Sequence, residues 1–313
     1  MRSRVFAVVL AAATALSAPL LAQGLGKGKV LVVKLADGIY AGSPEKGANV
    51  GWFVLGDGVV AVDSGGDSAS GSDILKAIGE TTGNKPVRAL ILTHSHSDHA
   101  GGARAFAAAG ARILCQENDA GQILAFVTQP ATRPDDPLYG KAALKPVVES
   151  IAERIILLDG IASAQVFFIA PAHTKGDLVV YLPTDKIMYV GDLAANGHLP
   201  FMQSDDVDPV GWERTLSALS QVASEKVVPG HGEVGTRTML TESLAYVHAV
   251  NKLAKKLVDA NVAEAALDAQ IRAKENEIPG VTMSDAHVAN VKAVVKAMKE
   301  KAAKAPAPTP AAK

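Results

Sequence analysis

The chain has 313 residues, of which 48% are hydrophobic and 20% are charged, so it can bury a sizeable core. This composition excludes a protein that is disordered throughout. Lysine and arginine number 31 against 32 aspartate and glutamate, a balance that argues against electrostatic binding to nucleic acid or to an anionic membrane. A single cysteine, Cys115, excludes an internal disulfide framework and any zinc site built from several cysteines.

Residues 1–22 have the pattern of a secretory signal peptide. Arg2 and Arg4 give a positive start, an apolar stretch runs from Val5 to Leu16, and Ala22 is a small residue suited to cleavage. The apolar run is shorter than the ~20 residues that a membrane-spanning helix needs. We therefore expect cleavage near Ala22 and a periplasmic or secreted mature protein without a membrane anchor.

Residues 23–236 predict a domain in which strands alternate with helices. Apolar and β-branched runs predict strands over Lys29–Leu35, Val50–Leu55, Val59–Val62, Val87–Leu92, Arg112–Cys115, Arg154–Leu158, Gln165–Ile169, Leu178–Leu182, Ile187–Val190 and Lys226–Val228. Helical spacing predicts helices over Ser72–Glu80, Ala103–Ala109 and Trp212–Val222. A proline-rich stretch, Gln129–Tyr139, predicts an irregular loop between the two strand-rich blocks. The blocks themselves indicate two similar halves of a sandwich.

Residues 237–301 predict a helical extension, and residues 302–313, rich in alanine, proline and lysine, predict a disordered tail. An apolar stripe on the first of these helices either covers the sandwich or meets a partner subunit, and the oligomeric state stays open. His248 and His287 lie on these helices away from any strand end, so we expect both at the surface.

The run from His94 to His99, with sequence HSHSDH, places three histidines and an aspartate within six residues. It follows a buried strand and precedes a helix, at the carboxyl end of the strand where ligands gather in α/β folds. Imidazole and carboxylate are ligands of zinc and related metals. Alternation along an extended chain puts His94 and His96 on one side, while Asp98 and His99 point toward a second position. The run therefore predicts a metal site.

Three later residues stand in the same context, each directly after an apolar strand: His173, Asp192 and His231. Taken singly, each could be an ordinary turn, cap or loop residue. Taken with the HSHSDH run, they form four strand-end positions, which we expect to converge on one rim of the fold.

The ordered motifs HSHSDH, AHT, GDL and PGHG resemble those of the metallo-β-lactamase superfamily, over roughly residues 29–235. The resemblance implies an α/β fold, a four-layer αβ/βα sandwich of two similar halves, here with extra C-terminal helices. It also implies two zinc ions, with iron or manganese as alternatives. The implied ligands are His94, His96 and His173 for the first ion, Asp98, His99 and His231 for the second, and Asp192 as a bridge. Asp63 matches a structural aspartate of the family and is not counted as a ligand.

The resemblance further implies a hydrolase in which a metal-bridging hydroxide attacks a carbonyl-type bond of a small-molecule substrate, with Asp98 as the catalytic residue that orients the hydroxide. Export favours a β-lactam or a related cyclic amide or ester. Asp192 argues against a true lactamase, because many of those have cysteine or serine at the matching place. The alternatives are a thioester, lactone or phosphodiester hydrolase, or a non-catalytic periplasmic zinc-binding accessory protein.

Candidate substrate contacts lie just beyond two of the implied ligands. Asn196 and His198 follow Asp192, and Lys175 follows His173. Asn196 and His198 could donate hydrogen bonds to a substrate, and Lys175 could attract a carboxylate. Asn196 and His198 could equally be exposed loop residues, whereas a lone loop lysine such as Lys175 is more often simply solvated.

Overall fold

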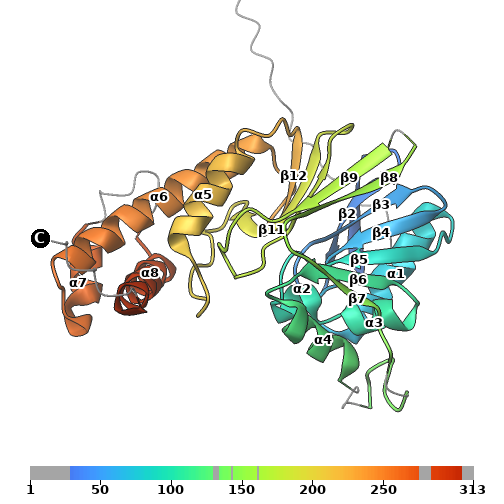
Figure 1. Cartoon of the computed structure of the whole chain (residues 1–313), viewed down its shortest axis with the longest axis horizontal. Helices are drawn as coiled ribbons and strands as arrows, with labels where there is room; N and C mark the ends of the chain where they lie inside the picture. The colour runs from blue at the N-terminus through green and yellow to red at the C-terminus, as the bar shows by residue number, and fades with distance from the viewer. Residues whose placement is uncertain (1–28, 130–133, 142–143, 161, 275–282, 305–313) are drawn as a thin grey trace, which may run out of the picture.

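The computed structural model describes residues 29–129, 134–141, 144–160, 162–274 and 283–304. Two β-sheets pack face to face, and helices cover the outer face of each, which confirms the expected four-layer α/β sandwich (Figure 1). The predicted signal peptide and residues 305–313 of the predicted tail lie outside the described residues, as does part of the proline-rich loop, residues 130–133.

The first sheet has seven strands in sequence order among the described residues. They are β1 (Val30–Ala36), β2 (Ile39–Pro44), β3 (Val50–Leu55), β4 (Gly58–Val62), β5 (Val87–Ile91), β6 (Arg112–Gln116) and β7 (Val148–Ile151). The first four pair antiparallel and the rest pair parallel. Parallel pairing needs crossovers, and these contain α1 (Ser68–Thr82), α2 (Ser97–Ala100), α3 (Ala103–Ala108) and α4 (Ala120–Thr128).

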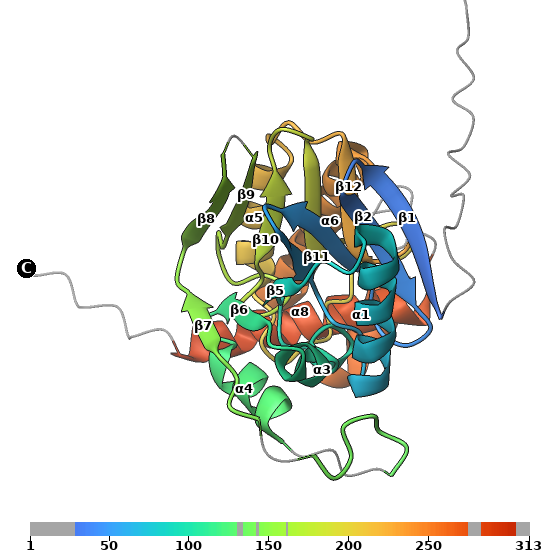
Figure 2. The ribbon, with the colours of Figure 1, turned by 90° about the vertical axis from the view of Figure 1, so that its right-hand side faces the viewer.

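Within the described ranges, the second sheet has five strands in the order β12-β11-β10-β9-β8. They are β8 (Arg154–Asp159), β9 (Ala162–Phe167), β10 (Val179–Leu182), β11 (Ile187–Ala195) and β12 (Lys226–His231). Its outer face is covered by α5 (Pro209–Leu219) and α6 (Arg237–Asp259), followed by η1 (Glu264–Ala266), α7 (Leu267–Arg272) and α8 (Asp285–Lys304). Figure 2, seen from the side of α1 and α3, shows α5, α6 and α8 behind the sheets. Residues 302–304, predicted as tail, continue α8.

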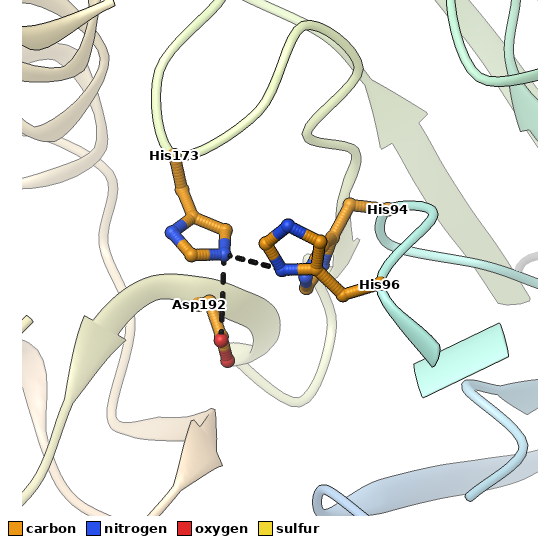
Figure 3. A group of neighbouring side chains, drawn as sticks. All are labelled: His94, His96, His173 and Asp192. Carbon is orange, nitrogen blue, oxygen red and sulfur yellow. Dashed lines mark hydrogen bonds and ion pairs between the residues drawn. The ribbon is translucent and has the colours of Figure 1, made fainter. Parts of the chain in front are cut away.

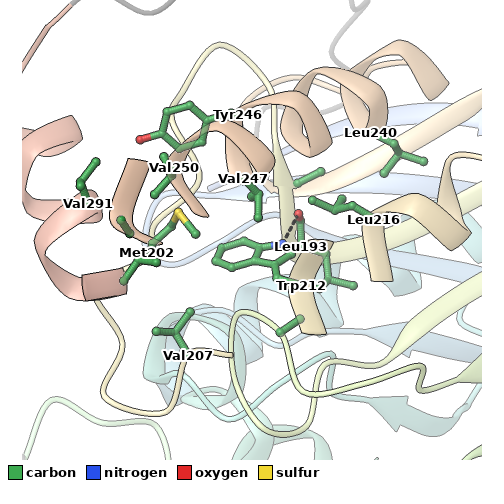
Figure 4. Close-up of a cluster of buried hydrophobic side chains, with 14 of the residues drawn as sticks. Leu193, Met202, Val207, Trp212, Leu216, Leu240, Tyr246, Val247, Val250 and Val291 are labelled. Carbon is green, nitrogen blue, oxygen red and sulfur yellow. Dashed lines mark hydrogen bonds between the residues drawn. The ribbon is translucent and has the colours of Figure 1, made fainter. Parts of the chain in front are cut away.

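Three apolar cores separate the four layers. Alternation along β3 puts Trp52 in the core beneath α1 and α3, and its neighbour Phe53 in the core between the sheets. Trp212 and Leu240 belong to the third core, between the second sheet and α5, α6 and α8 (Figure 4). The apolar stripe of α6 therefore covers the sandwich. Among the described residues, no helix has the length and apolar character that crossing a bilayer requires.

Capping explains why two helices begin earlier than predicted. The Asp67 carboxylate accepts a hydrogen bond from the backbone N–H of Ser70, so α1 begins at Ser68. Asp208 accepts in the same way from two backbone N–H groups, and Pro209 occupies the first turn of α5. Four further elements were not predicted, namely β2, α2, α4 and β7, each of which is short.

The prediction for His287 was wrong, because this residue is buried, with 1% of its surface exposed. His287 shares a helical face with Val291 and Val294, at the spacing that places side chains on one side of α8. Its Nδ1 lies 3.1 Å from the hydroxyl of Tyr246, which partners the ring within the core. His248 is exposed, as expected, and pairs with Glu213.

We expect Leu240→Ala to lower the free energy of unfolding by about 2–5 kcal/mol, because it opens a cavity in the third core. Leu240 is fully buried, whereas Leu31 on β1 is 65% exposed and provides a matched control. Urea unfolding should leave Leu31→Ala within about 0.5 kcal/mol of the parent protein. Equal effects of the two substitutions would contradict the packing of α6 on the second sheet.

Candidate metal centre

One group of potential ligands comes from three separate segments of the chain (Figure 3). His94 and His96 follow β5, His173 follows β9, and Asp192 lies in β11. One ligand atom from each of the four lies within 4.8 Å of the others. Nε2 of His173 is 3.0 Å from Nδ1 of His96 and 3.5 Å from Oδ2 of Asp192. These distances bring the side chains close enough to share one ion.

A second group lies beside the first and combines Asp98, His99 and His231. Nε2 of His231 is 3.1 Å from Oδ2 of Asp98. Asp192 lies between the two groups, with Oδ1 at 3.2 Å from Nε2 of His99 and Oδ2 at 3.5 Å from Nε2 of both His173 and His231. All of the residues implied as ligands thus lie together, and Asp192 faces both groups.

Hydrogen bonds behind the site fix which ring nitrogen of two histidines faces the centre. Nδ1 of His173 lies 3.0 Å from the carbonyl oxygen of Phe201 and must donate to it, so Nε2 keeps its lone pair. Nδ1 of His99 lies 2.9 Å from the Asp63 carboxylate, which orients that ring in the same way. Asp63 also accepts from the backbone N–H of Thr93, at 2.8 Å. Asp63 therefore supports the site from behind and does not face its centre.

Several atoms at the centre are buried without a hydrogen-bond partner in the described part of the chain. They are Nε2 of His94, Nε2 of His99 and Oδ1 of Asp192. Burying such groups unpaired is costly, and a cation that accepts their lone pairs removes the cost. Nitrogen and carboxylate oxygen together suit zinc. The residues present therefore fit a metal centre.

The protonation states of three candidate ligands, His94, His173 and Asp192, suit a metal as well. Burial lowers the pKa of His94, and it lowers the pKa of His173 to about 4, so both rings are neutral at physiological pH. Burial alone would raise the pKa of Asp192, but the neighbouring His99 and His231 outweigh it and hold that pKa well below its usual range. Neutral imidazoles and an ionised carboxylate are the forms that bind metal.

Glycine in the PGHG motif is required by the close approach of the backbone to the site. A Cβ on Gly230 would lie 2.0 Å from Oδ1 of Asp192, so any side chain there would displace the carboxylate. The neighbouring turn is held by Asn49, whose Nδ2 donates to the carbonyls of Pro229 and Gly232 at 3.0 and 2.7 Å. This role of Asn49 could not be predicted from the sequence, because its partners lie about 180 positions away in the chain.

A cavity of about 510 Å³ opens over the site. Its lining residues are His96, Asp98, Asp192, Ala195, His198, Leu199, Pro200, Phe201, His231 and Gly232. Of the candidate substrate contacts, His198 belongs to this lining. Nδ2 of Asn196 instead donates to the carbonyl of Glu233, and Lys175 is exposed outside the lining.

The sequence profile of the metallo-β-lactamase superfamily matches residues 44–231. This span contains every residue of both ligand groups and most of the sandwich, and the chain therefore belongs to the metallo-β-lactamase superfamily.

Individual relatives are distant. A linear primary-alkylsulfatase of a Pseudomonas species is 26% identical over 61% of this chain and 44% of its own length. The beta subunit of a 2,4-dinitroanisole O-demethylase of a Nocardioides species is 27% identical over 61% of this chain and 55% of its own length. The chain thus spans about half the length of these curated relatives. The solved structure of a metallo-β-lactamase from Pontibacter korlensis superposes with a TM-score of 0.57 and 24% identity, covering 70% of this chain and 99% of the other, and shows the shared fold.

We expect Gly230→Ala to reduce zinc affinity about 10–100-fold, the range for lost support of a ligand, because the added methyl group displaces Asp192. Zinc titration of the chelator-treated protein measures the effect. Gly121→Ala is the matched control, since a Cβ at Gly121 in α4 meets nothing within 4 Å. Unchanged affinity in a folded Gly230→Ala protein would contradict the placement of Asp192 as a ligand.

Proposed function

We propose that the protein is an exported dinuclear zinc hydrolase that cleaves a carbonyl-type bond in a small-molecule substrate, such as a cyclic amide or ester. One observation carries this proposal: two groups of histidine and aspartate ligand atoms share Asp192 at the floor of an open cavity. Catalytic metal sites differ from structural ones in keeping a side open to substrate.

His94, His96 and His173 would hold one ion, and Asp98, His99 and His231 the other, with Asp192 between them. When bound, two zinc ions supply Lewis-acid polarisation of the scissile bond and lower the pKa of water toward about 7. The support for this assignment is that both groups contain buried nitrogen or oxygen atoms with no hydrogen-bond partner among the described residues.

Asp98 is the residue best placed to handle the proton of the attacking water. Its carboxylate lines the cavity, is 40% exposed and lies 3.1 Å from Nε2 of His231. Burial acts to raise the pKa of Asp98, but the hydrogen bond from His231 outweighs it and lowers this pKa, so the carboxylate is ionised. Asp98 accepts the water's proton and passes it to the leaving group.

The wall of the cavity favours a substrate with an apolar group beside the scissile bond. Leu199, Pro200 and Phe201 are consecutive along this wall, and half of the Phe201 surface is exposed. His198 lies next to them and donates a hydrogen bond to the polar part of the substrate. The apolar wall and the similarity to an alkylsulfatase support a second candidate, an alkyl sulfate ester.

A substrate panel tests the reaction class. The zinc-loaded protein is assayed with a chromogenic cephalosporin, a lactone, a thioester, bis-nitrophenyl phosphate and an alkyl sulfate. We expect turnover of the lactone or the cephalosporin, and Asp98→Asn should lower kcat about 100–10,000-fold. Ser97→Ala, at the exposed neighbouring position, is the control. A zinc-loaded protein that turns over no substrate would support a binding role instead.

Export is supported by the pattern of residues 1–22 and is tested separately. We expect the full chain, expressed in a Gram-negative host, to be recovered from the periplasm with Gln23 as its first residue. N-terminal sequencing and intact mass measure this. A chain that still begins at Met1 in the cytoplasmic fraction would contradict export while leaving the hydrolase proposal intact.

A further inference from the structure

The segment Pro200–Met202 connects the cavity to the helices beyond the second sheet. Pro200 and Phe201 line the cavity, while Met202 is fully buried in the third core. The Phe201 carbonyl oxygen accepts the hydrogen bond from Nδ1 of His173. This short segment therefore supplies both a wall of the pocket and the group that orients a candidate metal ligand.

A single buried amide on α8 binds this segment on both sides of Phe201. Nδ2 of Asn290 donates to the carbonyl of Pro200 at 2.8 Å, and Oδ1 accepts from the backbone N–H of Met202 at 3.1 Å. Nδ2 also donates to the hydroxyl of Tyr246 at 2.9 Å. Only 1% of Asn290 is exposed, so water does not compete for these bonds.

The surroundings of Asn290 leave it little freedom. Tyr246 on α6 contacts His287 on α8 as well as Asn290, so the amide belongs to a polar cluster inside an apolar core. Farther along α8, Lys296 pairs with Asp205 at 3.0 Å, a second contact with the chain that follows Met202. A fully hydrogen-bonded buried group of this kind rigidifies what it contacts.

We propose that Asn290 is a positioning residue of the active site: by binding Pro200 and Met202 it fixes the Phe201 ring at the cavity wall and the Phe201 carbonyl against His173. The part that concerns substrate rests on the proposed hydrolase function. The part that concerns the segment and His173 does not. The C-terminal helices thus take part in building the site, although they contribute none of its ligands.

The first test requires no substrate. Asn290→Leu keeps a similar side-chain volume but removes the hydrogen bonds to Pro200 and Met202. We expect amide hydrogen exchange in the peptide spanning residues 199–204 to become about 5–10-fold faster. This factor corresponds to the net stabilisation that a typical hydrogen bond provides. We expect zinc affinity to fall about 10-fold, because His173 loses its fixed partner. Lys292→Ala is the control, since Lys292 lies on α8 but pairs with Asp268.

The second test uses turnover and a double-mutant cycle. If Asn290 acts on substrate through the Phe201 ring at the cavity wall, Asn290→Leu raises KM about 10-fold. Its effect on kcat is then smaller than the effect of Phe201→Ala on kcat. The double variant should then be no worse in KM than Phe201→Ala alone, because two residues that act through one contact are not additive. Fully additive effects on KM would overturn the positioning role.

The outcomes separate the two proposals. Faster exchange and weaker zinc binding in a protein that turns over no substrate would support the positioning role and count against the hydrolase. Unchanged exchange and zinc affinity in folded Asn290→Leu would overturn the positioning role whatever the activity. Should Asn290→Leu fail to fold, Asn290→Ala, which leaves room for water to satisfy the freed groups, is measured by the same criteria.

Discussion

The convergence of imidazole nitrogens on the Asp192 carboxylate is the constraint on which the rest of the site depends. His99, His173 and His231 each place a ring nitrogen within 3.5 Å of this carboxylate. Nδ1 of His173 donates its proton to the Phe201 carbonyl, so Nε2, which faces the centre, carries a lone pair. Lone pairs directed at an anion in a buried place repel one another unless a cation lies between them. A metal ion between these groups would remove that repulsion, which is the physical basis of the proposed metal centre.

The sandwich meets this constraint with strand ends from both halves of the chain. β5 leads into the HSHSDH run, and the adjacent, parallel strands β11 and β12 carry Asp192 and His231. Strand ends held in a sheet move little, which keeps ligands within the narrow geometry that a metal demands. Gly230 then allows the backbone of β12 to approach Asp192. The sheets hold the side chains rigidly, and the absence of a side chain at Gly230 leaves room for the Asp192 carboxylate.

The candidate ligands could be predicted from the sequence because each follows an apolar run and belongs to a residue type that binds metal, although Asp192 proves to lie within β11. The same reasoning could not identify Asn49 or Asn290, because their partners are backbone carbonyls and N–H groups, which carry no residue signature. His287 was misassigned for a related reason: a histidine within a helical apolar face becomes buried when a partner such as the Tyr246 hydroxyl satisfies it. Long-range pairing of polar groups is set by the packed fold, and a pattern along the chain does not reveal it.

The helices that follow the second sheet can position parts of the site without contributing a ligand to it. α6 packs against α5 and the second sheet, and α8 packs against α6, which places Asn290 beside the segment that leads from the cavity. An amide side chain on a packed helix holds its hydrogen-bond partners more precisely than a loop residue does, because the surrounding side chains fix its rotamer. The wall of the cavity in this chain is therefore tied to helices outside residues 44–231, the part that the family profile matches. Variation in such helices can alter the shape of the pocket while leaving the metal ligands unchanged.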